Sequence, residues 1–417
     1  MKQFVLFFIC IAAMACNSVE PLSPGGEVDD VMPRDRVDIK LTKAQKAYVT
    51  KGNDFAFNLF REVMAREKGS FMISPLSVEY ALAMLCNGAA GTTQGEILGC
   101  LGFSSDEMDA VNEYCKYLTE ALYDADNTVK LNLANAMVSN TALAHLKLAY
   151  VSALENWYDA LVKGYDFSKD NTAALSYING WAKEKTYGMI PSVLDELSPS
   201  AYLILMNAIY FKGAWNSKNG FSENDTKNGD FTTGKGGKIK VAYMNQESRM
   251  SYASDNLCQI VSLPYGNGAF AMDVLVPHEG VTVQEVAASL KAGAFPRSYP
   301  DKQVKLKLPR FETENDRIEL VDVLKSLGIK SAFSDLQADF SKMTDDAVFV
   351  SDVFQKTKIK VNEKGSEAAA VTVGVYSSGI STTPPPVPEV YATRPFVYAI
   401  HETSTGAILF MGAFCGN

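Results

Sequence analysis

Residues 362–388 decide the fold, and they read Asn-Glu-Lys-Gly-Ser-Glu-Ala-Ala-Ala-Val-Thr-Val-Gly-Val-Tyr-Ser-Ser-Gly-Ile-Ser-Thr-Thr-Pro-Pro-Pro-Val-Pro. The valines and threonine at 371–373 favour a β-strand. Side chains alternate between the two faces of a strand, and one face here is uniformly small: Ser366, Ala368, Ala370, Thr372 and Gly374. Prolines at 384–386 and 388 cannot donate to a sheet ladder. The stretch therefore predicts a strand that can slide between neighbouring strands and must then stop.

The same residues allow a second interpretation, because alanine has the highest helix propensity. Taken alone, the alanines at 368–370 equally favour the end of a helix that runs into a linker. The flanking sequence separates the two interpretations. Residues 362–370 closely resemble the hinge of the reactive-centre loop in the serpin family, and residues 394–398 and 409–412 resemble that family's two C-terminal strands.

The resemblance to serpins extends over nearly all of residues 42–417. Further matching segments occur in the family's order at 73–77, 91–97, 207–215, 263–265, 308–311 and 338–341. The resemblance implies an α+β fold with a large central mixed sheet, two further sheets and about eight or nine helices. It also implies an exposed reactive-centre loop at about residues 363–388.

Local patterns independently predict an α+β domain. Apolar residues recur at helical spacing in 43–68, and a short strand with a capping serine precedes a second helix that ends at Gly88. Four apolar segments are typical of strands: 203–212, 259–265, 270–276 and 304–308. Helices and strands are interleaved without a regular βαβ rhythm, and no internal repeat or linker composition interrupts residues 42–417, which predicts one domain.

The N-terminus is typical of a targeting segment. Residues 1–15 combine Lys2, an apolar run at 4–11 that is too short to span a bilayer, and small residues before Cys16. Residues 13–16 resemble a bacterial lipobox, in which the cysteine is acylated; the alternative is an ordinary signal peptide with an incidental cysteine. Residues 16–41 predict a flexible tether. We expect a protein outside the cytoplasm that lipid anchors to a bacterial outer membrane, on its periplasmic or cell-surface face.

Charge and composition exclude several classes of partner. The formal charge of −9 argues against nucleic-acid or anionic-lipid binding, and we expect a monomer. No zinc-like cysteine spacing or glycine-rich phosphate loop is present, so neither a metal nor a cofactor is expected. Downstream of Cys16 the cysteines number five and lack framework spacing, which predicts small buried side chains: Cys86, Cys100, Cys115, Cys258 and Cys415.

No catalytic constellation emerges, so the chain is not expected to be an enzyme. None of the three histidines, His145, His278 and His401, lies in a motif that pairs a base with a nucleophile. We expect His145 to be structural and His401 to lie in a surface turn. Ser366 lacks the strand-to-helix elbow of a hydrolase serine. A secreted lipoprotein hydrolase is therefore disfavoured.

The resemblance implies a suicide inhibitor of serine or papain-like cysteine endopeptidases. The target would form an acyl-enzyme with the loop, and the freed loop would enter the central sheet as a new strand. The implied hinge is Glu363, Lys364, Gly365, Ser366, Glu367, Ala368, Ala369 and Ala370. The implied polar residues beneath the opening strands are Ser74, Ser77, Asn207 and Gln355, with Trp215 where the loop enters. Two departures are Gln355, where the family often has histidine, and Thr393, where an amide or acid is usual.

The reactive bond follows from a family count of about sixteen residues beyond Glu363, a length set by the inserted strand. That count gives Gly379-Ile380, but the loop is longer than usual, so Tyr376-Ser377, Ser378-Gly379 and Ile380-Ser381 stay open. No lysine or arginine lies between Lys364 and Arg394, which predicts an elastase-like, subtilisin-like or papain-like target. The alternative function is a non-inhibitory serpin-fold binding protein or chaperone.

Overall fold

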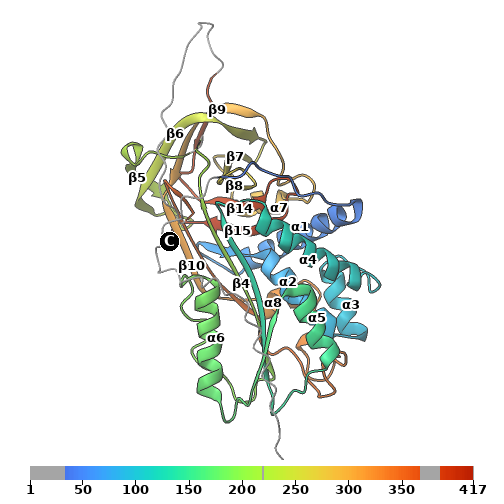
Figure 1. The fold of residues 1–417 in the computed structure, drawn as a ribbon. Coiled ribbons are helices and arrows are strands. Elements are labelled where there is room, and N and C mark those ends of the chain that lie inside the picture. The colour runs from blue at the N-terminus through green and yellow to red at the C-terminus, as the bar shows by residue number, and fades with distance from the viewer. Residues whose placement is uncertain (1–32, 218–219, 367–385, 417) are drawn as a thin grey trace, which may run out of the picture.

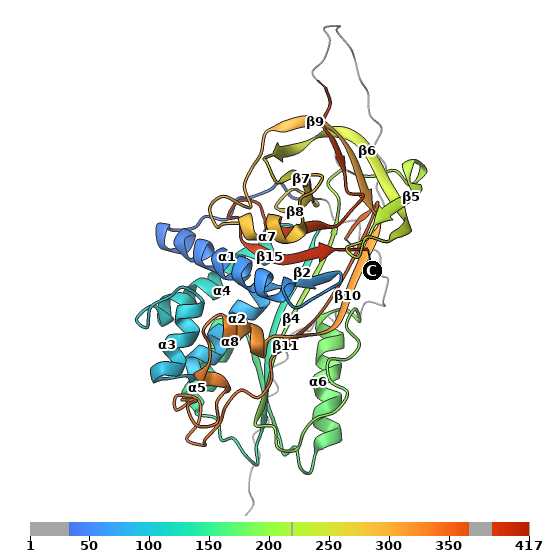
Figure 2. The same ribbon diagram turned by 180° about the vertical axis from the view of Figure 1, so that it is seen from behind.

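The computed structural model describes residues 33–217, 220–366 and 386–416, which form helices packed around two sheets. The described α-helices are α1 (Lys43–Met64), α2 (Pro75–Gly88), α3 (Gly91–Cys100), α4 (Met108–Asp124), α5 (Leu148–Tyr158), α6 (Asn171–Lys185), α7 (Val283–Ser289) and α8 (Val321–Ser326). Two short 3₁₀ turns are η1 (Glu223–Asp225) and η2 (Ser331–Phe333). Figures 1 and 2 show α6 on one side of the long strand β4 and the group α1 to α5 on the other.

The central sheet has six strands. In spatial order they are β10 (Phe311–Glu319), β11 (Phe354–Asn362), β12 (Gly365–Ser366), β4 (Leu203–Ala214), β2 (Lys130–Asn140) and β3 (Leu161–Tyr165). Neighbours are antiparallel except β2 and β3, so the sheet is mixed. Among the described residues, only the two-residue strand β12 joins β11 to β4, whereas the other neighbouring strands of this sheet pair over longer stretches.

The second sheet has nine strands, eight of them in one continuous path. In order these are β1 (Phe71–Ile73), β15 (Ile408–Phe414), β14 (Phe396–Glu402), β8 (Phe270–Pro277), β7 (Cys258–Pro264), β6 (Lys238–Ser254), β9 (Asp301–Pro309) and β13 (Glu389–Tyr391), with β5 (Lys227–Thr232) paired to β6. The long β6 pairs with β7 near its C-terminal end and with β9 along much of its length. The two further sheets that we expected are therefore joined through β6, and the predicted α+β fold class is confirmed.

Local chemistry explains the first two helices. Thr42 caps α1 in a capping box with Gln45, which satisfies amides that the first helical turn leaves unpaired. Ser74 caps α2 by accepting from the amide of Ser77, and Pro75 occupies the first helical position, where its missing N–H costs nothing. Both predicted helices are confirmed, and the four predicted strands appear as β4, β7, β8 and β9.

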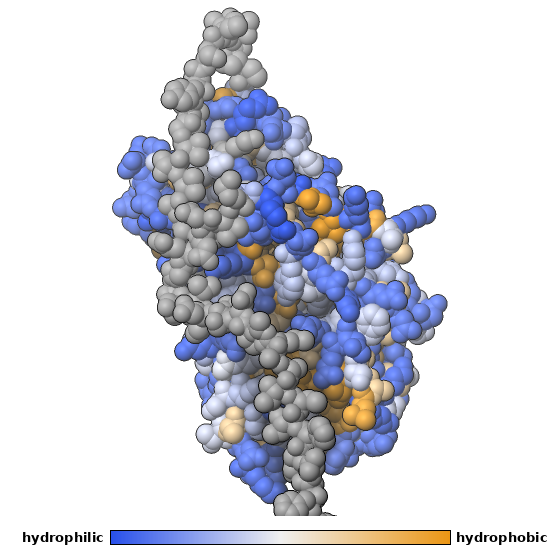
Figure 3. All heavy atoms as spheres, in the orientation of Figure 1, coloured by the Kyte–Doolittle hydropathy of each residue, from blue (hydrophilic) through white to orange (hydrophobic). Residues whose placement is uncertain are grey.

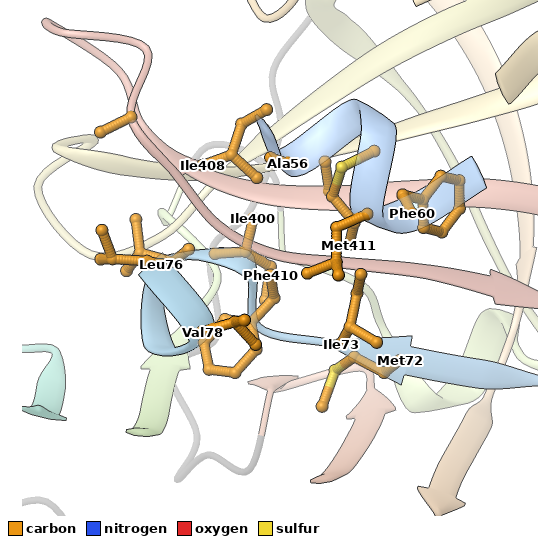
Figure 4. Packing of buried hydrophobic residues seen from close by; sticks show 14 of the residues in the cluster. Ala56, Phe60, Met72, Ile73, Leu76, Val78, Ile400, Ile408, Phe410 and Met411 are labelled. Carbon is orange, nitrogen blue, oxygen red and sulfur yellow. The ribbon is translucent and has the colours of Figure 1, made fainter. Parts of the chain in front are cut away.

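The main core lies between the helices and both sheets. Figure 4 shows Phe60 of α1 beside Met411 of β15, and Phe410 of β15 beside Val78 of α2. A smaller cluster packs α6 against β2 and β4 through residues such as Ile178. Removal of this apolar area from water is the principal stabilising term. α2 therefore sits in the main core directly beneath the central sheet.

Residues 33–41 differ from the flexible tether that the sequence predicted for 16–41. Arg34 bonds Asp124 and Asn127 at the end of α4, and Arg36 donates to the carbonyl of Gly268. The amide of Ile39 donates to Ser404, and its side chain packs against the main core. Specific partners therefore hold this part of the predicted tether on the domain; its remaining residues, 16–32, lie outside the described part of the chain.

The histidine expectations need one correction. His401 is not in a surface turn: it lies within β14, 4 % exposed, with Nε2 3.3 Å from Asp273 of β8. Burial alone would lower the pKa of His401, but the Asp273 carboxylate raises it above its ordinary value. His145 is exposed and contacts Asp346. The sequence misled us at His401 because Glu402 suggested a polar turn, whereas its carboxylate accepts from Ser404 and Thr405 and is buried.

The face of the molecule drawn in Figure 3 carries mostly polar residues where it is coloured. Blue residues cover much of the face in Figure 3, where apolar residues gather in a few patches. The five cysteines of the described residues are free; Cys86, Cys115 and Cys258 are buried, as predicted for small apolar side chains, and two are half-buried. Burial raises the pKa of Cys86 and Cys258 to about 12, so these thiols are poor nucleophiles.

Glu79 of α2 carries a buried carboxyl that predicts an unusual pH dependence. It is 5 % exposed and lies against Gly52 of α1, where an added Cβ would come within 2.8 Å of a carboxylate oxygen. Burial raises the pKa of Glu79 from 4.5 to about 8. In the unfolded chain the group ionises near 4.5, so stability is fully present below that value and falls as the pH rises to about 8.

We expect Glu79→Gln to remove this loss and to stabilise the protein at pH 8 by a few kcal/mol, since one pKa unit is worth about 1.4 kcal/mol. Urea unfolding at pH 5 and pH 8 measures the effect. Glu113→Gln, an exposed carboxylate on α4, is the control and should leave the pH dependence unchanged. Equal midpoint shifts at both pH values in Glu79→Gln would contradict the assignment.

Candidate functional site

The candidate site is the place where the chain begins to enter the central sheet. Gly365 pairs with Asn362 of β11 on one side and with Ala214 of β4 on the other. Ser366 likewise pairs with Val361 and with Gly213. Beyond these two residues, no described strand lies between β11 and β4. The central sheet thus holds the first two residues of a strand whose continuation would have to come from residue 367 onward.

Gly365 is required here for two reasons. Its φ of +136° is a conformation that residues with a Cβ rarely adopt. A Cβ at this position would also lie 2.1 Å from the carbonyl oxygen of Gly213. The glycine therefore lets the chain turn back from β11 and approach the backbone of β4. Both the turn and the close approach occur within the segment that the sequence predicts to be the hinge.

Ser366 is anchored in the core by an aromatic pair. Its hydroxyl lies 2.6 Å from the hydroxyl of Tyr265, and Ser366 is 1 % exposed. The ring of Tyr265 stacks on Trp215 with centroids 4.6 Å apart. The indole N–H of Trp215 donates to the carbonyl of Asn362, and the backbone amide of Trp215 donates to the carbonyl of Lys364. Trp215 therefore borders the point at which the chain leaves β11.

An ion pair fixes the base of the hinge. Glu363 is buried and receives two hydrogen bonds from Nε of Arg310, at 2.7 and 2.8 Å, and another from Thr226. Burial alone would raise the pKa of Glu363, but Arg310 and Thr226 hold it below its ordinary value. The carboxylate therefore stays ionised at neutral pH, and the next residue, Lys364, is exposed.

A chain of polar side chains bridges the gap between β11 and β4 lower in the sheet. Gln355 of β11 accepts from the amide of Ser74 at 2.8 Å and donates to its carbonyl at 3.1 Å. Ser77 bonds Asn207 of β4, which donates to Asn135 of β2. The strands are linked here through the N-terminus of α2 and not by direct backbone pairing. Gln355 thus connects β11 to the N-terminus of α2 through an amide side chain, which does not titrate.

A cavity of about 170 Å³ lies along the same gap. Residues 203–209 of β4 and 354–358 of β11 line it from the two sides, and side chains of α2 and α6 contribute to its walls. Packed protein interiors leave few voids larger than a water molecule, so a space of this size between two strands is unusual. The space follows the course that a continuation of β12 would take.

The structure thus gathers many of the predicted site residues around one gap. Ser74, Ser77, Asn207 and Gln355 form the polar chain, and Glu363, Lys364, Gly365, Ser366 and Trp215 surround β12. The remaining predictions lie outside the described residues: Glu367, Ala368, Ala369 and Ala370 of the hinge, the bonds at Tyr376, Ser377, Ser378, Gly379, Ile380 and Ser381, and the lipidation site Cys16.

Sequence reasoning missed three partners of these residues. Arg310 and Tyr265 lie within matching segments, but no role was assigned to either because their contacts join distant parts of the chain. Asn135 of β2 extends the polar chain to the carbonyl of Tyr158. A buried glutamate in the hinge would need a positively charged partner, but the sequence does not show which lysine or arginine side chain supplies it.

The described residues contain no group of three or more His, Cys, Asp or Glu that could hold a metal ion. Among them, no helix combines the length and apolarity needed to cross a membrane.

Comparisons with known proteins agree with this geometry. Residues 50–416 match the family model described as "Serpin (serine protease inhibitor)". Iripin-2 of Ixodes ricinus is 34 % identical over 377 residues, which cover 88 % of this chain and 93 % of that protein. Iripin-8 of the same species is 32 % identical over 86 % of this chain and 91 % of its own length.

Solved structures give the same result. The thermophilic serpin tengpin in its native state has a TM-score of 0.81 and 27 % identity, covering 94 % of this chain and 98 % of that one. Native protease nexin-1 with heparin has a TM-score of 0.78 and 26 % identity, covering 89 % and 100 %. The matched length, the sheet topology and the hinge between β11 and β4 together show that this chain belongs to the serpin family.

Proposed function

We propose that this protein traps an endopeptidase as an acyl-enzyme by inserting its cleaved loop into the central sheet. The observation that carries the proposal is β12, which already occupies two residues of the space between β11 and β4. Family membership supports protease inhibition in general. The open space below β12 supports the specific route, because an additional strand has a place to pair.

Continuing the register of β12 predicts how the inserted strand would lie. Residue 368 would stand opposite Ile359 and Phe211, both buried, and Thr372 would stand opposite Gln355 and Asn207 at once. The small residues at even positions would then face the core. Thr372 would present a hydroxyl to two polar side chains, which can satisfy it. This fit between a sequence pattern and a separate polar chain supports insertion in that register.

Insertion would have the energy to disable a protease. About ten new backbone hydrogen bonds, each worth about 0.5–1.5 kcal/mol net, would contribute on the order of ten kcal/mol. A tethered acyl-enzyme dragged along the sheet would be distorted near the acyl bond. Loss of one oxyanion-hole donor slows acyl-transfer chemistry by about a hundred- to a thousandfold, so a small distortion would stall deacylation.

The reactive bond is proposed to lie between residues 376 and 381, with Gly379-Ile380 as the first choice. In the continued register, residue 376 stands opposite Leu203, where β4 begins. Cleavage beyond that point leaves enough loop to fill the length of β4. The absence of lysine and arginine between Lys364 and Arg394 disfavours a trypsin-like target. We therefore propose an elastase-like, subtilisin-like or papain-like target.

The test is incubation of the protein with representatives of these three classes and with trypsin. We expect a covalent complex that survives denaturing electrophoresis with one of the three, and a released peptide whose N-terminus lies at 377–381. A serpin-fold protein that acts only as a binding protein or chaperone would be cut without forming a complex. Stoichiometric inhibition of trypsin would contradict the proposed loop specificity.

We also propose that lipid on Cys16 anchors the protein to a bacterial membrane. The support is the lipobox-like sequence at 13–16 and a chain of 16 residues, 17–32, before the segment that is held on the domain. Two or more acyl chains hold a protein on a membrane where one does not. Cys16→Ser should release the protein from the membrane fraction or leave it unprocessed. Recovery of the parent protein in the soluble fraction would exclude the anchor.

A further inference from the structure

Tyr265 follows β7 and is buried in the core, yet its hydroxyl reaches the loop. The side chain has no exposed surface, and the hydroxyl lies 2.6 Å from that of Ser366. The ring is held from two sides, by stacking on Trp215 and by an edge contact with Phe211 at 4.9 Å. Burial raises the pKa of Tyr265 well above its ordinary range, so the hydroxyl keeps its proton.

The turn that carries Tyr265 is attached to the upper end of β4. The amide of Gly266 donates to the carbonyl of Ala214, and the amide of Asn216 donates to the carbonyl of Pro264. Asp126, from the connection between α4 and β2, accepts from the amide of Asn267 in the same turn. The hydroxyl of Tyr265 is therefore fixed relative to β4 before any loop residue beyond Ser366 has paired.

A fixed position for Ser366 matters because the register of the incoming strand decides which residues are buried. If the observed register of Ser366 continued along the inserted strand, even-numbered loop residues would face the core. A slip by one residue would turn every side chain to the opposite face. It would direct Glu367, and with it an unpaired charge, into the core in place of Ala368. The hydrogen bond from Tyr265 opposes this slip because only a polar side chain at the paired position can satisfy it.

We propose that Tyr265 is a positioning residue for loop insertion. It holds Ser366 in register, so that the inserted strand extends from β12, which is already paired with β11 and β4. The inference rests on the proposed inhibitory function and assigns to Tyr265 a role in the fate of the acyl-enzyme. Ordering the first residues of a strand costs entropy before many hydrogen bonds are gained. Because β12 is already ordered, this entropy cost does not slow loop insertion, which is the step that competes with deacylation of the acyl-enzyme.

The test uses Tyr265→Phe, which keeps the ring and removes only the hydroxyl. The measurement is the stoichiometry of inhibition with the elastase-, subtilisin- or papain-type enzyme that forms a complex with the parent protein. We expect about a fivefold increase in the inhibitor molecules consumed per enzyme trapped. Ser366→Ala should give a similar increase, and the double variant should give no more than either, because both remove the same hydrogen bond.

Tyr243→Phe is the matched control, since the hydroxyl of Tyr243 also makes one hydrogen bond, but to the carbonyl of Asp230 in β5 and not to a hinge residue. It should leave the stoichiometry unchanged. The thermal midpoint of each uncleaved variant shows whether the substitution simply destabilises the protein. An unchanged midpoint assigns the effect to the partition between trapped enzyme and cleaved inhibitor. The inference is overturned if Tyr265→Phe traps enzyme as efficiently as the parent, or if its effect adds fully to that of Ser366→Ala.

The experiment distinguishes failure of the proposed inhibitory function from failure of the role assigned to Tyr265. In that case the parent protein itself forms no complex with any of the enzymes, which removes the inference together with the function. A parent that traps enzyme while Tyr265→Phe behaves like Tyr243→Phe removes the inference alone and leaves the function standing.

Discussion

Ser366→Arg is expected to be cleaved as a substrate and to lose stable complex with its target by about a hundredfold or more. Ser366 is 1 % exposed and its hydroxyl meets that of Tyr265, so a guanidinium there would be buried where the observed partner is an uncharged hydroxyl. Burying an unpaired charge costs several kcal/mol, and every ~1.4 kcal/mol slows a step about tenfold. Insertion would become slower than deacylation. The measurement is the ratio of stable complex to cleaved product on denaturing gels.

Lys364→Ser is the matched control, because Lys364 is charged and exposed two residues earlier in the same hinge. Its complex yield should equal that of the parent. Ala368→Asp is a second variant: it leaves β12 intact and would place a carboxylate between Ile359 and Phe211 in the continued register. Parent-like complex yield in both Ser366→Arg and Ala368→Asp would be incompatible with insertion at this gap.

Cleavage of the loop between 376 and 381 is expected to raise the thermal midpoint by on the order of 10 °C. The inserted strand would gain hydrogen bonds worth on the order of ten kcal/mol and would fill the cavity of about 170 Å³ between β11 and β4. The uncleaved form is then a kinetic trap, with a more stable arrangement that an intact loop does not reach. Thermal unfolding of intact and nicked protein measures the difference.

The same nick in Ser366→Arg provides the comparison, because it cuts the loop without permitting insertion. That nicked variant should melt no higher than its intact form. A nick in an ordinary linker leaves the midpoint unchanged, and a nick in a core strand lowers it. Either outcome in the parent protein would refute the insertion route while leaving family membership untouched.

Much of the site could be inferred from residues 362–374, since period-two alternation and glycine preference are local properties. The small even-numbered face and Gly365 needed no knowledge of the partners. By contrast, the requirement for Gly365 is only partly local: the carbonyl of Gly213, 152 positions earlier in the chain, is what a Cβ would strike. At His401 the local sequence was misleading. The polar residues there suggested a turn, but His401 belongs to β14 and lies beside Asp273.

The sequence by itself determined the helix and strand pattern, the small alternating face and proline stop of the loop, and the family resemblance. Tertiary structure alone decided that Arg310 neutralises Glu363, that Tyr265 holds Ser366, and that Gln355 and Asn207 connect through α2. The physical reason is range. Propensity and periodicity act between residues a few positions apart, whereas a buried charge or hydroxyl is satisfied by whatever the topology brings within about 3 Å.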